Sequence, residues 1–103
     1  MDKDILEHLY LLESAVSELA ELNGHSSTRP ISFSLFCLQH ELTLKERDDL
    51  ILLINKCFSE NKDANFVSLK EQINIKLPKT KLFSDKVMSG MIEILKKDYL
   101  ISD

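Results

Sequence analysis

The sequence has few of the residues that interrupt regular backbone structure. Among 103 residues there are two glycines, two prolines and no tryptophan, and aromatic residues make up 7%. An all-β fold needs many tight turns, in which glycine and proline are prominent. The chain is therefore predicted to be all-α. Glycine loops that bind phosphate are excluded too, because the only glycines, Gly24 and Gly90, stand far apart.

Long hydrophobic runs are also missing, and none reaches the roughly 18 residues that suggest a membrane-spanning helix. The N-terminus, MDKDILEHLY, is too acidic for a secretory signal peptide, which starts with a positive region. We therefore expect a cytoplasmic protein with no membrane partner. Cys37 and Cys57 each lie in an apolar segment, and both are expected to be reduced and buried.

Charge is spread unevenly along the chain. Residues 1–63 carry 6 basic and 12 acidic side chains, whereas residues 64–103 carry 7 lysines and 5 acidic side chains. Neutralisation of phosphates supplies most non-specific affinity for nucleic acid, so the acidic first part argues against wrapping of nucleic acid. The basic C-terminal third leaves a narrower form of nucleic-acid binding open.

The first predicted helix, from Asp4 to about Leu22, carries a regular apolar pattern. Its members recur at spacings of four, three, four and three, and we call them the seam: Ile5, Leu9, Leu12, Val16 and Leu19. This spacing is that of the a and d positions of a coiled coil. Asn23-Gly24 predicts the end of the helix, with Gly24 in the left-handed conformation. We expect the seam to be an oligomer interface; the alternative is that it covers residues 50–58 within one monomer.

The remainder of the chain is predicted to form further helices in one domain, residues 1–103. Residues 1–23 are the coiled-coil-like helix, 24–30 a polar linker, and 31–103 a helical core. Residues 31–40 form a dense apolar segment that we interpret as a short buried helix. The next helix starts at a capping box, Thr43 to Glu46, and its apolar residues at 50–58 predict a helix surrounded by others at the centre of the core.

Two more helices complete a compact bundle of about five. Ser68-Leu69-Lys70-Glu71 resembles a second capping box, which predicts a short helix through about Ile75, and Pro78 prevents its continuation. The last helix is expected to open at Ser84 and to end near Lys97. Gly90, inside this helix, either marks a place where another backbone comes close or is simply tolerated.

Residues suited to catalysis or metal binding are not arranged as those functions require. Cys37 and His40 could share one helical face, but a metal site usually needs three or four ligands, and no second pair follows. We expect Cys37 to be packed and His40 to be exposed. Acidic pairs such as Asp48-Asp49 suit the first turn of a helix, where they complement its dipole. No enzyme activity, cofactor or metal is therefore expected.

The order of features resembles the YhaI-like family, short all-helical proteins of unknown function from Gram-positive bacteria and their phages. The matching segments are Leu6-Glu7-His8, Pro30 before Phe33 to Leu38, Leu42-Thr43-x-x-Glu46, Phe66-Val67 and Asp98-Tyr99-Leu100. This chain differs in a longer segment at residues 76–83 and in ending soon after Tyr99. The resemblance implies a cytosolic helical fold that self-associates, and it transfers no functional residue.

A second resemblance, over residues 43–101, is to winged-helix DNA-binding domains. Residues 67–73 are similar to the second helix, residues 84–95 to the recognition helix and residues 96–101 to the first wing strand. Four lysines would then lie near phosphates: Lys76, Lys79, Lys81 and Lys86. The long turn before Ser84 and a recognition helix without Arg, Asn or Gln oppose this alternative.

The leading hypothesis is a non-enzymatic protein–protein interaction module, regulatory or phage-encoded, that self-associates through its first helix. It would also present an acidic or apolar surface to a further protein that the sequence does not identify. The alternative is a small winged-helix-like DNA-binding transcriptional regulator that uses residues 68–101. Salt-sensitive DNA binding would favour this alternative.

Overall fold

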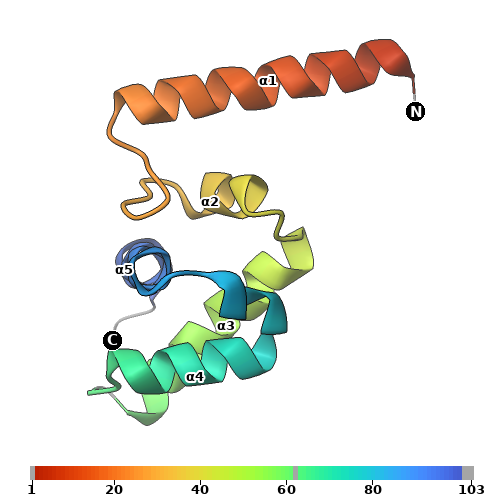
Figure 1. The fold of residues 1–103 in the computed structure, drawn as a ribbon. Helices are drawn as coiled ribbons and strands as arrows, with labels where there is room; N and C mark the ends of the chain where they lie inside the picture. Colours follow the sequence, from red (N-terminus) through yellow and green to blue (C-terminus); the bar gives the residue numbers. More distant parts are fainter. Residues whose placement is uncertain (1, 62, 101–103) are drawn as a thin grey trace.

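The computed structural model describes residues 2–61 and 63–100 and is all-α, with five α-helices and one short 3₁₀ helix in these residues. The elements follow in the order α1 (Lys3–Leu22), α2 (Phe33–Gln39), α3 (Leu44–Glu60), α4 (Phe66–Lys76), η1 (Pro78–Leu82) and α5 (Asp85–Tyr99). The predicted all-α fold of about five helices is confirmed. Figure 1 shows that α2 to α5 gather together, while α1 extends away from them.

The core is built by α2 to α5. Its fully buried large side chains include Phe33 and Phe36 of α2, Leu50 of α3, and Met88 and Leu95 of α5. Six residues of α5 are buried, against three of α3. The interpretation of α3 as the centre of the core was therefore wrong, and α5 has that place.

One face of α3 is open to solvent, contrary to the prediction of a helix surrounded by others. Leu50, Ile54 and Cys57 are buried, but Leu52 is 70% exposed. Helices α2, α4 and α5 contact α3 on its other faces, and none of them covers Leu52. The apolar residues around α3 thus belong partly to the core and partly to the surface.

The helix ends follow local capping chemistry. Thr43 and Glu46 form the predicted capping box of α3, and the Ser84 side chain accepts the Val87 N–H at the start of α5. The predicted start of α4 was three residues late: Asn65 is the N-cap, and its side chain accepts the Ser68 N–H at 2.9 Å. Ser68 therefore lies inside the helix.

The last helix is longer than predicted, because α5 continues to Tyr99. The first wing strand expected at residues 96–101 is thus wrong for residues 96–99, which are helical, and residue 101 lies outside the described residues. Tyr99 packs against the core, with its ring 5.8 Å from that of Phe33. The C-terminal end of α5 is therefore a helix packed against the core, and not a β-strand.

Gly90 lies where another backbone segment comes close to α5, which was one of the two interpretations of this glycine. A Cβ atom built on Gly90 would lie 2.4 Å from the Thr28 carbonyl oxygen and 3.2 Å from Pro30 Cδ. Any larger residue would push the segment between α1 and α2 away from α5. Gly90 therefore seats this segment on the core.

Candidate interaction surface on the first helix

Helix α1 has no buried residue along its 20 residues. Its large apolar side chains are between 48% and 83% exposed: Ile5, Leu6, Leu9, Tyr10, Leu11, Leu12, Val16, Leu19 and Leu22. All five seam residues are in this set. The alternative in which the seam covers residues 50–58 within one monomer is wrong, because α1 stands apart from α3 (Figure 1).

Such a helix lacks the usual source of helix stability. In proteins, most helical stability comes from tertiary packing of an apolar face rather than from helix propensity. The described part of the chain offers α1 no such packing. An exposed apolar stripe on an unsupported helix is typical of a surface that binds another protein.

The acidic side chains of α1 and of its N-cap lie around the apolar stripe. Residues 2–22 contain six acidic side chains and a single basic one, Lys3. Asp2 caps the helix by accepting the Asp4 N–H at 3.1 Å. The surface of α1 therefore combines a wide apolar stripe with a net negative charge.

The C-terminal end of α1 is fixed to the core by a defined structure rather than by a loose linker. Gly24, at φ +95°, donates its N–H to Glu21 O, and His25 donates its N–H to Ala20 O. This pair of bonds is a Schellman motif, and only glycine adopts that conformation at little cost. The predicted stop at Asn23-Gly24 is confirmed.

His25 locks the segment that follows. Its side chain is only 4% exposed, its Nδ1 accepts the Ile31 N–H at 3.1 Å, and its Nε2 lies 2.8 Å from Gln39 Oε1. Because Nδ1 accepts a hydrogen bond, the neutral ring carries its proton on Nε2 and donates it to Gln39. His25 is thus a buried anchor residue in the polar linker, and its hydrogen bonds fix the point at which α1 leaves the core.

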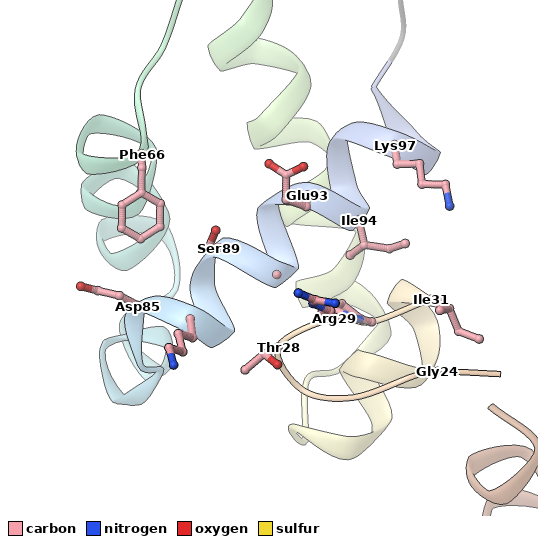
Figure 2. A pocket seen from close by; sticks show the side chains of 13 residues that line it. Gly24, Thr28, Arg29, Ile31, Phe66, Asp85, Ser89, Glu93, Ile94 and Lys97 are labelled. Atoms are coloured by element: carbon pink, nitrogen blue, oxygen red, sulfur yellow. The ribbon is translucent and has the colours of Figure 1, made fainter. Parts of the chain in front are cut away.

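A groove of about 1120 Å³ lies next to the C-terminal end of α1, between residues 24–31 and α5. Figure 2 shows Phe66 on one side, the loop with Thr28 and Arg29 on the other, and Ser89 and Glu93 on α5 between them. Arg29, Lys86 and Lys97 supply positive charge to its lining, and Asp85 and Glu93 supply negative charge. The lining thus carries charges of both signs, and Asp85 is already paired with Lys70.

The four lysines of the DNA-binding alternative are not equally free. Lys79 donates to Glu46 Oε1 at 2.9 Å and to the Glu41 carbonyl oxygen at 3.3 Å, so its charge is neutralised within the protein. Lys76, Lys81 and Lys86 are exposed. Three lysines thus remain as candidates for phosphate contacts.

Cys37 is buried, and His40 is half-buried against aromatic rings. Burial raises the pKa of the Cys37 thiol to about 12, which leaves very little of the nucleophilic thiolate near neutral pH. The His40 ring lies 4.2 Å from that of Phe36 and 5.2 Å from that of Phe83, so the expectation of an exposed His40 was wrong. Burial, and then the nearby His25, lower the pKa of His40. Both cysteines are free and buried, as predicted.

Residues 2–61 and 63–100 lack the features of two other kinds of site. No group of three or more His, Cys, Asp or Glu side chains is placed to hold a metal ion. None of these described helices combines the length and the apolar character needed to cross a membrane. Comparison with known proteins gave no match to a family model, to a curated protein or to a solved structure. Membership of the YhaI-like family stays a prediction.

Proposed function

We propose that this chain is a non-enzymatic protein–protein interaction module whose binding surface is α1, and that the first partner of α1 is a second copy of the same chain. The observation that carries the proposal is that α1, an apolar, heptad-patterned helix joined to a folded core, has no buried residue and leaves its seam about half exposed. The YhaI-like resemblance adds a bacterial or phage origin and self-association to this proposal; the regulatory role is part of the proposal itself. An unidentified protein would then bind the assembled form.

The energetics support self-association. Fully burying a Leu side chain stabilises by roughly 1.5–3 kcal/mol, and the seam residues are already about half shielded, so each would gain about 1 kcal/mol. Ten seam side chains from two copies would contribute about 10 kcal/mol, against an association cost of about 4 kcal/mol or more. The remaining stabilisation of about 6 kcal/mol corresponds to a dissociation constant of tens of micromolar.

Self-association is tested by substituting the seam. Leu9→Glu with Val16→Glu places four carboxylates in the interface of a dimer, so light scattering should give the monomer mass for this variant and a larger mass for the unchanged protein. The matched control is Tyr10→Glu with Leu11→Glu, which makes the same kind of change on the same helix outside the seam. The control should associate like the unchanged protein. Equal masses for the two double variants would contradict the assignment of the seam.

A further inference from the structure

The heptad pattern of α1 allows each residue to be placed relative to a partner helix. Leu9 and Val16 take position a, and Ile5, Leu12 and Leu19 take position d. The seam from Ile5 to Leu19 is about 21 Å long at 1.5 Å per residue. Another helix with the same spacing of apolar residues matches a stripe of this length.

The charges of α1 are distributed as a pairing of two acidic helices requires. Asp4, Glu7, Glu18 and Glu21 fall at positions c and f, which face away from a partner. Glu13, at position e, is the one acidic residue of α1 that flanks the seam. Two copies can therefore come together without bringing most of their negative charge close.

The residue that meets Glu13 depends on the orientation of the two helices. In a parallel pair, position g faces position e of the following heptad, so His8 lies opposite the partner's Glu13, and symmetry repeats this contact. In an antiparallel pair, e faces e and g faces g. Glu13 would then meet Leu6, Ala20 or another Glu13, and His8 would lie on the other side of the seam.

We infer that two copies of this chain join through α1 as a parallel, in-register, two-stranded coil, with His8 of each copy beside Glu13 of the other. The inference rests on the proposed function and adds the orientation, the register and the charged contact to it. Val16 at position a, with Leu12 and Leu19 at position d, is the combination that favours two strands, whereas Leu9 at a and Ile5 at d is the combination of larger assemblies; the number of strands is therefore inferred from residues 12–19, the part of the seam nearest the core. Because α1 joins the core only at its C-terminal end, a parallel pair places both cores at the same end of the coil (Figure 1).

Disulfide cross-linking of two single variants tests the orientation. Ile5→Cys and Leu19→Cys, one of them with a size tag, are mixed, reduced, equilibrated and then oxidised with glutathione disulfide. Both native cysteines are buried, so the unchanged protein serves as the blank. A parallel coil should give only the two homodimers, since residues of the same number lie adjacent across a parallel seam. In an antiparallel pair, residues of the same number at position 5 or 19 lie near opposite ends of the coil, so both homodimers would be absent and any cross-link would be the mixed dimer. This result would overturn the inference while leaving self-association intact.

Charge reversal tests the contact itself. Glu13→Lys should weaken association roughly tenfold, because two exposed contacts between His8 and Glu13 are lost in each dimer. Adding His8→Glu to this variant should restore the affinity, since a carboxylate then faces each introduced lysine. No change in either variant would overturn the proposed register. Absence of any cross-link, together with a monomer mass for the unchanged protein, would overturn both the inference and the proposed function.

Discussion

Substitution of Gly90 by alanine separates two effects of opposite sign. Alanine in place of glycine inside a helix stabilises by about 1 kcal/mol from helix propensity alone. The added Cβ would, however, lie 2.4 Å from the Thr28 oxygen and 2.8 Å from the Thr28 carbonyl carbon. These are backbone atoms, which cannot turn aside as a long side chain does, so α5 and residues 25–30 must separate.

The expected net effect is a loss of stability. Overpacking a fitted contact costs roughly 1–3 kcal/mol, and the two backbone contacts place Gly90→Ala toward the upper end of that range. After subtraction of the propensity gain, the free energy of unfolding should fall by about 1–2 kcal/mol. Urea denaturation followed by circular dichroism measures this change.

The control for Gly90→Ala is Ser89→Ala, its neighbour in α5. Ser89 is exposed, so this variant gains helix propensity without a new contact and should be as stable as the unchanged protein or slightly more so. If Gly90→Ala proves about 1 kcal/mol more stable than the unchanged protein, the close seating of Thr28 on α5 is refuted.

Three other parts of the molecule give further expectations. Ile54→Asp should abolish the cooperative thermal transition, because it buries an unpaired carboxylate. Leu52→Asp should melt within a few degrees of the unchanged protein, because Leu52 is exposed. Equal melting of the two variants would show that the assignment of the buried and exposed faces of α3 is wrong. The Cys37 thiol should react with a thiol reagent only after denaturation. Rapid labelling of the native protein would disprove the burial of this thiol. Because burial raises its pKa from 9.0 to about 12, the contribution of Cys37 to the free energy of unfolding should be lost as the pH rises from 9 toward 12. Thr43→Ala should cost about 1 kcal/mol in urea denaturation. Hydrogen bonds from Thr43 and Lys79 lower the pKa of Glu46, so its stabilisation is complete above pH 4.5 and lost as the pH falls through the lowered value; Glu46→Gln should remove this acid dependence.

Features that depend on a few neighbouring residues could be predicted from the sequence. The capping box at Thr43, the cap at Ser84 and the stop at Asn23-Gly24 are set by contacts within one turn of helix, and all three are confirmed. The start of α4 shows how this reasoning fails. Ser68 fits a capping box, but Asn65 takes the Ser68 N–H, and two candidate caps three residues apart cannot be ranked without the rest of the fold.

Features that depend on distant segments could not be predicted. Nothing around His25 distinguishes it from an exposed linker residue, because its partners Ile31 and Gln39 act only once α2 has packed. Leu52 looks like its buried neighbours, and its exposure depends on which faces of α3 the other helices cover. The seam could be predicted because its residues are close in sequence and share one face of α1. The sequence does not determine which segment or partner covers that face. The structure shows that α3 does not cover the seam, since α1 has no buried residue.

Sedimentation equilibrium of the unchanged protein tests the central claim most directly. The monomer mass is 11.9 kDa. If α1 binds a second copy through its seam, the apparent mass should rise with concentration from 11.9 kDa toward twice that value over roughly 1 to 300 µM, as expected for micromolar affinity. A mass that stays at 11.9 kDa over this whole range would contradict the claim that a second copy is the partner of α1.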